Sequence, residues 1–423
     1  MSSSQEKQTL THLLQHRIME MQNKKIELLA PAGDMERLDM VLHYGADAVY
    51  LAGKDFGMRA SAGNFDEKAM RIAGEKCRKN GTKMYVTVNT LPHEGQLEYL
   101  PGFLQSARDA GADAFIIADL GVMAMAKKYA PDVPLHISTQ LGIVNSETAK
   151  MLYDMGAERV VLARETSMEE IRLMRERIPA DLEIEAFVHG AMCVSFSGRC
   201  LLSNYMTGRD ANGGACAQPC RWKYHLMEEK RPGEFFEISE DGGTYILNSN
   251  DMCMIEHIPE LIEAGVSSFK IEGRMKSAYY AAVVTNAYRH AIDDYYAGKP
   301  FDKVWLDECM KVSHRKYSTG FYYGDPGQYY CSNDTIYFSD ADVCAIVEEC
   351  DADGNAIVSQ RNKIVLGDEL ELVCKDGTPV RFTLEAMQNA EGERIEAAPH
   401  PMMKIKMRLP RQAESLALLR KMK

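Results

Sequence analysis

Long hydrophobic runs are missing from this chain of 423 residues. No stretch approaches the roughly 20 uncharged apolar residues that a membrane-spanning helix needs. The first residues, MSSSQEKQTLTHLLQHRIMEM, also lack the apolar segment of a secretory signal. We therefore expect a cytoplasmic protein with no membrane partner.

An excess of positive charge is lacking as well, because the formal net charge is −12. This value argues against indiscriminate nucleic-acid binding, although a net charge is a sum and can hide a local basic face. The chain contains no His-Glu-x-x-His helix, Gly-x-Ser-x-Gly elbow, Walker loop or Gly-x-Gly-x-x-Gly motif. Proteases, ATPases and NAD enzymes therefore lack their usual signatures here, but a Ser or Cys nucleophile with partners distant in sequence stays possible.

The chain does contain a repeated alternation of short apolar runs and amphipathic segments, which indicates parallel βαβ units. Eight such units predict a closed (β/α)₈ TIM-like barrel. The expected strands are Ile26–Pro31, Ala48–Ala52, Lys83–Thr90, Ala114–Leu120, Leu135–Gln140, Arg159–Glu165, Leu182–His189 and Ser268–Arg274. The expected helices are Met35–His43, Asp66–Asn80, Gln96–Ala110, Val122–Ala130, Ser146–Met155 and Ser167–Ile178. Gly45, Gly111, Gly156 and Gly265 each stand directly before such a strand, as in a repeated turn that ends a helix.

The barrel does not account for the whole chain, because one core stops growing at about 250–300 residues. We expect an N-terminal extension (1–24), the barrel (25–330) with a Cys-rich insertion (190–250), a small antiparallel β-barrel domain (331–410) and a basic tail (411–423). The small domain is predicted from short apolar runs between Asp-Gly and Asn-type turns. Its boundary with the barrel should fall within Thr319–Tyr330.

Four of the eleven cysteines stand close together, with six, fifteen and three residues between Cys193, Cys200, Cys216 and Cys220. Buried thiols, a zinc site and an iron–sulfur cluster are all open on this spacing. Zinc sites usually come from paired Cys-x₂-Cys knuckles, whereas an iron–sulfur cluster accepts irregular spacing. A radical-SAM enzyme would need a further cysteine at position 223, which is a lysine.

Strand alternation places several charged side chains inside the barrel, toward strand C-termini, where active sites of this fold lie. Phe269 and Ile271 should face the helices, so Lys270, Glu272 and Arg274 should face inward. The candidate catalytic residues are Glu185, His189, Lys270 and Glu272. The candidate substrate-binding residues are Arg59, Asn89, Gln140, Arg164 and Arg274, whose cations suit a small polycarboxylate or a phosphate. A purely structural ion network, pairing Lys270 with Glu185 or Glu272, is the alternative.

Two segments are locally basic. Residues 190–231 carry six Lys or Arg against three Asp or Glu, with aromatic residues among them, and residues 401–423 carry seven against one. Arginine beside aromatic side chains is the composition of a single-stranded RNA site, although an ordinary solvated surface would look the same. Arg209, Arg221, Trp222 and Lys223 are the candidate RNA-binding residues.

Three motifs carry a family resemblance: Leu29-Ala-Pro-Ala-Gly33, Glu185-Ala-Phe-Val-His-Gly-Ala-Met-Cys193 with its continuation to Ser203, and Phe269-Lys-Ile-Glu-Gly-Arg274. They resemble the collagenase-like peptidase family of unassigned catalytic type, over about residues 25–410. The segments 204–212 and 217–222 are similar to the branch of tRNA hydroxylation proteins within that family.

This resemblance implies an oxygen-independent, prephenate-dependent hydroxylation of wobble uridine to 5-hydroxyuridine. It implies a [4Fe-4S] cluster on Cys193, Cys200, Cys216 and Cys220, a tRNA anticodon stem-loop as partner, and prephenate as the small carboxylate substrate. A homologous partner subunit is a further possibility. A collagenase-like peptidase and a non-catalytic iron–sulfur RNA-binding protein are the alternatives.

Overall fold

The computed structural model describes residues 25–59, 62–193, 195–222, 226–227, 235–236, 249–324 and 338–423. The expected N-terminal extension, much of the insertion and most of the expected domain boundary lie outside these residues. Within the described part of the chain, every helix is too short or too polar to cross a membrane.

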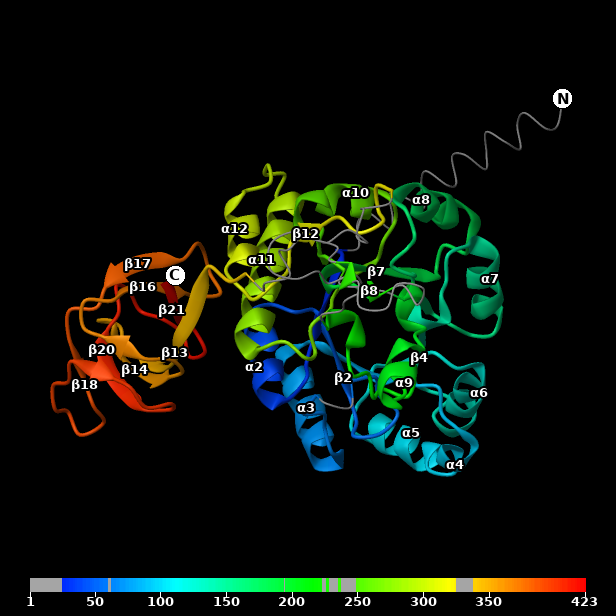
Figure 1. Ribbon diagram of the computed structural model, residues 1–423, viewed down its shortest axis with the longest axis horizontal. Helices are drawn as coiled ribbons and strands as arrows, with labels where there is room; N and C mark the ends of the chain where they lie inside the picture. The colour runs from blue at the N-terminus through cyan, green and yellow to red at the C-terminus, as the bar shows by residue number, and fades with distance from the viewer. Residues whose placement is uncertain are drawn as a thin grey trace.

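Eight parallel strands close into a barrel, because the last strand pairs with both the first and the seventh. Helices surround this barrel (Figure 1). Its strands are β1 (Glu27–Pro31), β2 (Ala48–Ala52), β3 (Lys83–Val88), β4 (Ala114–Ile117), β5 (Leu135–Ile137), β6 (Arg159–Val161), β7 (Glu183–Ala191) and β11 (Ser268–Ile271). The predicted TIM-like barrel is confirmed. Several strands end two to four residues before their predicted ends, so the predicted site residues after them lie on loops.

The helices begin at the polar residues that the sequence supplies. Asp34, Asp66, Asn145 and Ser167 each accept a hydrogen bond from the first turn of the following helix. The helices around the barrel are α2 (Met35–His43), α3 (Glu67–Asn80), α4 (Glu94–Leu97), α5 (Leu100–Asp109), α6 (Leu120–Tyr129), α7 (Ser146–Asp154), α8 (Met168–Arg177), α10 (Ile258–Glu263), α11 (Ala278–Tyr296) and α12 (Val304–Met310).

The repeated glycine turn is present at all four positions. Gly45, Gly111, Gly156 and Gly265 have φ values of 92°, 95°, 97° and 87°, a region that other residues adopt only with strain. Each glycine therefore lets the chain leave a helix and enter the next strand by the same route.

Two apolar cores flank the barrel wall. The outward side chains, Phe269 and Ile271 among them, pack against the helices. A smaller core fills the barrel interior, with Leu29, Tyr50, Tyr85 and Ile116. The predicted inward and outward faces of the eighth strand are therefore correct.

The insertion follows β7, which runs beyond the barrel rim and pairs with the antiparallel strand β10 (Asp251–Cys253). Strand β12 (Tyr317–Ser318) pairs with β10 in turn. Between β7 and β10, the insertion contains helix α9 (Leu202–Thr207) and the two-stranded pair β8 (Leu226–Met227) and β9 (Phe235–Phe236).

A curled antiparallel sheet forms the C-terminal domain, beside α2, α11 and α12 (Figure 1). Its strands in spatial order are β17 (Val380–Thr383), β16 (Glu369–Val373), β21 (Leu418–Met422), β13 (Ala341–Cys350), β14 (Asn355–Gln360), β20 (Lys404–Arg408) and β18 (Met387–Gln388). A separate pair joins β15 (Ile364–Val365) to β19 (Ala397–Ala398).

The expected basic tail at 411–423 is not a separate segment. Residues 418–422 form β21, which pairs with both β13 and β16 inside the sheet. Arg420 on this strand is fully buried, and its guanidinium contacts Glu308 of α12 and Glu371 of β16 at 2.6 and 2.7 Å. The sequence pattern failed here because charged side chains that pair across elements look like a solvated tail.

Candidate functional site

A cavity of about 580 Å³ opens at the C-terminal ends of the barrel strands, between the barrel and the described part of the insertion. Most of the predicted site residues line it. They are Arg59, Asn89, Gln140, Arg164, Lys270, Glu272, Arg274, Arg221 and the four cysteines Cys193, Cys200, Cys216 and Cys220. Residues from eight or more separate segments of the sequence therefore meet at one place.

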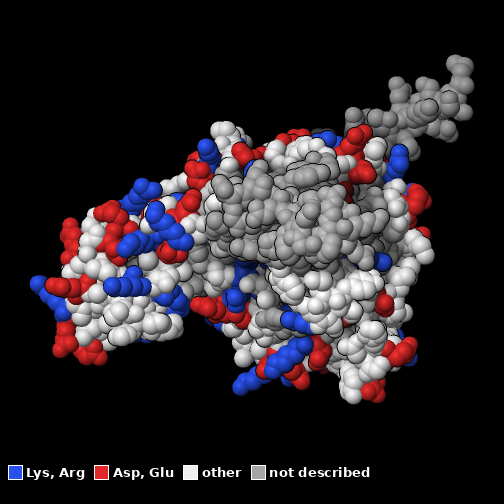
Figure 2. All heavy atoms as spheres, viewed as in Figure 1, with Lys and Arg blue, Asp and Glu red and all other residues white. Residues whose placement is uncertain are grey.

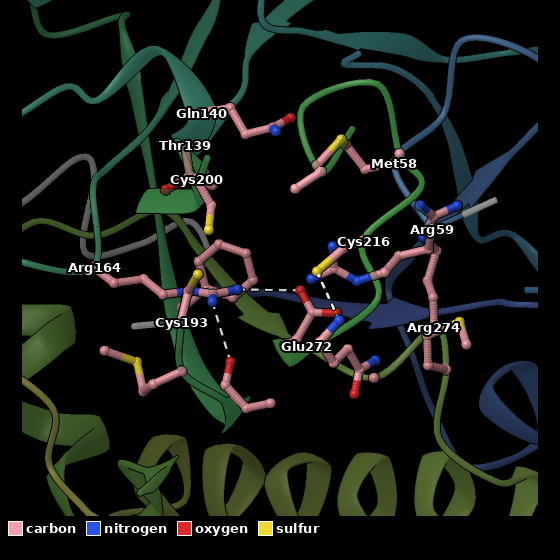
Figure 3. Close-up of a pocket in the computed structure, with 18 of the residues that line it drawn as sticks. Met58, Arg59, Thr139, Gln140, Arg164, Cys193, Cys200, Cys216, Glu272 and Arg274 are labelled. Carbon is pink, nitrogen blue, oxygen red and sulfur yellow. Dashed lines mark hydrogen bonds and ion pairs between the residues drawn. The ribbon is translucent and has the colours of Figure 1, made fainter. Parts of the chain in front are cut away.

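Glu272 is surrounded by arginine side chains. Arg164 lies on one side of it, with its Nη2 3.1 Å from a carboxylate oxygen of Glu272, and Arg59 and Arg274 lie on the other side (Figure 3). The guanidinium of Arg164 also donates to the carbonyl oxygen of Ala191 at 3.1 Å and stacks over the Phe187 ring. Three guanidinium groups thus face one carboxylate, which leaves an excess of positive charge for an anionic ligand.

This arrangement also fixes the charge state of Glu272. Burial opposes ionisation, but Arg59, Arg164 and Arg274 together hold the pKa of Glu272 below its usual value. Burial lowers the pKa of Arg274 to about 10. At neutral pH, Glu272 is therefore an ionised carboxylate, and its lowered pKa makes it a weak base.

The loop after β2 brings Arg59 to the cavity, and Asn89 holds that loop. The backbone N–H of Met58 donates to Asn89 Oδ1 at 3.1 Å. Arg59 itself has a φ of 79°, in the left-handed region, and its carbonyl oxygen accepts from the side chain of Asn64. Asn89 therefore positions the loop in addition to lining the cavity.

Lys270 and Glu185 form an ion network beneath the cavity. Lys270 Nζ lies 2.6 Å from Glu185 Oε1, and Arg159 binds the other oxygen of Glu185 at 3.1 Å as well as Glu27 at 2.6 Å. Glu185 is fully buried and does not line the cavity. An ion network between Lys270 and Glu185 is therefore present, as the alternative interpretation expects, and the assignment of Glu185 as a catalytic residue stays a prediction.

His189 also lies elsewhere than predicted. Strand β7 contains a bulge at Val188. Lys270 of β11 pairs with Phe187, and the next residue, Ile271, pairs with His189. This irregularity reverses the alternation, which places the imidazole among Tyr280, Tyr288 and Tyr317 outside the cavity. A bulge cannot be read from an apolar pattern, and the assignment of His189 to the reaction site is therefore corrected.

The four thiols converge on the cavity from two loops. Cys193 and Cys200 flank the short helix Phe196–Gly198. Cys216 precedes the short helix Pro219–Arg221, which contains Cys220. Burial and the nearby Cys193 and Cys216 raise the pKa of Cys220, so these three thiols lie close enough to interact. Figure 3 shows Cys216 beside Glu272, and Cys193 and Cys200 together on the side of Arg164.

Hydrogen bonds within the insertion hold these loops. Asn212 clamps Cys200, because its side chain accepts from the Cys200 N–H and donates to the Cys200 carbonyl oxygen, both at 3.3 Å. The N–H of Gln218 donates to Cys216 Sγ at 3.3 Å, and the buried Ser203 accepts from Ala217. An all-thiol donor set with a backbone N–H directed at sulfur fits an iron–sulfur cluster, and it would also accept zinc.

Two contributors were missed by the sequence reasoning. Glu165 accepts from the N–H and hydroxyl of Ser197, a residue with a φ of 36°, and so holds the loop between Cys193 and Cys200. Tyr50 lines the cavity and donates to the Ile271 carbonyl oxygen at 2.9 Å. Strand alternation in β2 would have identified Tyr50, whereas the Glu165 contact depends on the loop geometry.

Two of the candidate RNA-binding residues lie at the same opening. Arg221 lines the cavity, and Trp222 is 42% exposed beside it. Arg209 is exposed on the loop after α9, and Lys223 lies outside the described residues. The C-terminal domain differs, because its basic and acidic side chains alternate over its surface (Figure 2). Lys404 pairs there with Glu348, and Lys421 with Asp368.

These observations define a class of structure, a barrel with thiols and arginines at the mouth of one cavity. The model of peptidase family U32 matches residues 33–332, and the model of the C-terminal domain of that family matches residues 339–420. The chain belongs to peptidase family U32.

Its relatives carry different names. The chain is 38% identical over 403 residues to tRNA hydroxylation protein P1 of Bacillus subtilis, covering 94% of this chain and 95% of the relative. It is 36% identical to the 23S rRNA 5-hydroxycytidine C2501 synthase of Escherichia coli, over 65% of this chain and 40% of that protein. It is also 35% identical to a collagenase of Porphyromonas gingivalis, over 70% and 73% of the two chains.

Proposed function

We propose that this protein is an RNA-modifying enzyme that hydroxylates wobble uridine in tRNA to 5-hydroxyuridine, with prephenate as co-substrate and without molecular oxygen. The observation that supports this most is the cavity in which three arginines face Glu272 beside four thiols. The relatives named for tRNA hydroxylation and for 5-hydroxycytidine synthesis support an RNA base as substrate.

The arginines would bind the small co-substrate. Prephenate carries two carboxylates, and guanidinium groups bind carboxylates through paired, charge-assisted hydrogen bonds. Arg59, Arg164 and Arg274 would supply these bonds, while the ionised Glu272 would orient their guanidinium groups. A uridine would have to leave its stack to reach the cavity, and Arg221 and Trp222 at the opening would contact the surrounding nucleotides.

The four cysteines would hold a [4Fe-4S] cluster, which supplies one-electron transfer when bound. Cys193, Cys200, Cys216 and Cys220 are the ligands. Arg59 and Arg221 line the same cavity, so the thiolates and the anionic co-substrate share its positive charge.

A peptidase is the alternative, because one relative is named a collagenase. A thiol or hydroxyl nucleophile needs an adjacent base. Among the described residues that line the cavity there is no histidine, and Lys270 is paired with Glu185. This favours the modification reaction over proteolysis.

The test is expression in a bacterial strain without its own tRNA uridine hydroxylases, followed by mass analysis of tRNA nucleosides. The wild-type chain should produce 5-hydroxyuridine, and the variants Glu272→Gln and Cys216→Ser should not. Cys344→Ser, which changes a buried cysteine of the C-terminal sheet, should retain the product as a matched control. Absence of 5-hydroxyuridine with the wild-type chain, together with cleavage of gelatin by the purified protein, would favour the peptidase.

A further inference from the structure

A second group of sulfur and nitrogen ligands lies behind the barrel wall, away from the cavity. It consists of His189 of β7, Cys253 of β10 and Cys309 of α12, whose ligand atoms all lie within 4.8 Å of one another. None of the three residues lines the cavity. Because they come from positions 64 and 56 residues apart in sequence, their meeting is a property of the fold.

The hydrogen bonds around His189 leave one of its nitrogens for a ligand. The hydroxyl of Tyr317 donates to the Cys309 carbonyl oxygen at 2.9 Å, so its oxygen must accept from the Nε2–H of His189 at 3.2 Å. This fixes the tautomer and leaves the lone pair on Nδ1. That Nδ1 atom is buried and faces the thiol of Cys253, with which His189 interacts, and the residue is only 1% exposed.

A buried polar nitrogen normally has a partner, and here the groups that face Nδ1 are thiols, which are metal ligands. The neighbouring Tyr288 uses its hydroxyl elsewhere. Its hydroxyl donates to the Val188 carbonyl oxygen at 2.7 Å and accepts from the Met254 N–H at 3.1 Å. Tyr288 therefore borders the group of ligands without being one of them.

We propose that His189 Nδ1, Cys253 Sγ and Cys309 Sγ bind a thiophilic divalent cation of the zinc class. Zinc binds thiolates at about 2.3 Å and imidazole nitrogen at 2.0–2.1 Å, which places tetrahedral ligand atoms about 3.5–3.8 Å apart. The three atoms are already within 4.8 Å of one another, so small side-chain movements complete the site. Tyr317 would orient the imidazole through its second nitrogen, as partners of zinc-bound histidines commonly do.

The charge balance suits the buried surroundings. Binding of a divalent cation by two thiols and a neutral imidazole releases two protons, one from each thiol. The resulting group of one cation and two thiolates is neutral, so its burial avoids the large penalty of an isolated charge. A fourth position remains for water, because Cys253 is only partly buried.

The bound ion would fasten three elements together. Cys309 is on α12, which also contacts the C-terminal domain through Glu308, and Cys253 is on the strand by which the insertion returns. His189 stands four residues before Cys193 in sequence. The ion would thus hold in place the start of the loop that carries Cys193, the first cysteine of the cavity.

Zinc content and X-ray absorption at the zinc edge test this proposal on the full-length chain purified under reducing conditions. We expect about one zinc per chain with a shell of two sulfur and one or two nitrogen or oxygen ligands. The variant Cys253→Ala/Cys309→Ala should lose that zinc, with at least a tenfold drop in content. The matched control Cys77→Ala/Cys344→Ala removes two buried cysteines elsewhere and should keep it.

The outcomes separate this site from the four cysteines of the cavity. A shell of four sulfurs would place the zinc on Cys193, Cys200, Cys216 and Cys220 and would overturn the proposal. Wild-type chain that takes up no zinc or Co²⁺ would overturn it too, as would a Cys253–Cys309 disulfide found by peptide mapping of rapidly alkylated cells. The wild-type measurements need no substitution, so a variant that fails to fold leaves the proposal testable.

Discussion

At the scale of single residues, the cavity depends on arginines that outnumber the carboxylate they surround. Glu272 can pair fully with Arg164 at 3.1 Å, and Arg59 and Arg274 then retain bonding capacity for a ligand. Inward residues of the eighth strand were predictable from alternation. The surroundings of Glu185 and His189 were not, because Glu185 pairs with Arg159 and Lys270 on two other strands and His189 follows a bulge.

Removal of one cavity arginine should weaken binding of the anionic co-substrate. A hydrogen bond to a charged group contributes about 1.5–3 kcal/mol, so Arg59→Gln should raise the Kd for prephenate roughly 10- to 100-fold. Isothermal titration calorimetry measures this directly. Arg71→Gln, on the exposed face of α3, should bind like the wild type, and equal affinity for the two variants would contradict a role of Arg59 in binding.

At the scale of elements, an ionic group docks the C-terminal sheet on the barrel. Arg420 of β21 contacts Glu308 of α12 and Glu371 of β16, and Lys311 after α12 contacts both glutamates. Short strands and turns in the sequence predicted the sheet. They could not predict that its last strand is central, because pairing partners far apart in sequence leave no local signal.

This group should make the protein sensitive to acid. Burial alone would raise the pKa of Glu371, but Arg420, Arg381 and Lys311 hold it at about 2, below its usual 4.5. Its stabilising effect is therefore complete above about pH 4.5 and is lost as the pH falls toward 2. Glu371→Gln removes one of the two carboxylates that contact Arg420 and Lys311, which should cost up to about 3–5 kcal/mol, the value typical of breaking a buried ion pair.

Urea unfolding at pH 7, 5 and 3 measures this effect. The free energy of unfolding should be much lower for Glu371→Gln than for the wild type at pH 7, and this difference should be smaller at pH 3. Glu391→Gln, on an exposed turn of the same domain, should follow the wild type at every pH. A gap that is independent of pH would show that the variant disturbs packing rather than ionisation.

At the scale of the whole molecule, the net charge of −12 conceals where the cations stand. Lys404 and Lys421 of the C-terminal sheet are paired with carboxylates, whereas Arg209 is exposed on the loop after α9 and Arg221 lines the cavity. The sequence indicated that both segments are basic, the C-terminal one more strongly, and only the structure distinguishes them. The proposed tRNA contacts should therefore come from the insertion rather than from residues 411–423.

Salt titration of tRNA binding tests this distribution. Affinity should fall steeply with salt, and Arg209→Ala should reduce the slope of log K against log salt by about one. Trp222→Ala should weaken binding by about 1–3 kcal/mol with an unchanged slope, because base stacking is not ionic. Lys404→Ala, in the C-terminal sheet, should change neither quantity. Affinity that does not respond to salt would contradict an electrostatic tRNA surface.

The closure of the barrel has a consequence for how the chain folds and diverges. Each of the strands β1 to β7 pairs with a strand that is next to it along the chain. Strand β11 is separated from β7 by the whole insertion, and it closes the barrel by pairing with β7 and β1. The entropy lost on closing such a loop grows only logarithmically, by about 0.6 kcal/mol for each doubling of its length. The length of the insertion should therefore affect closure of the barrel only slightly, so evolution can lengthen or replace the insertion without weakening the barrel.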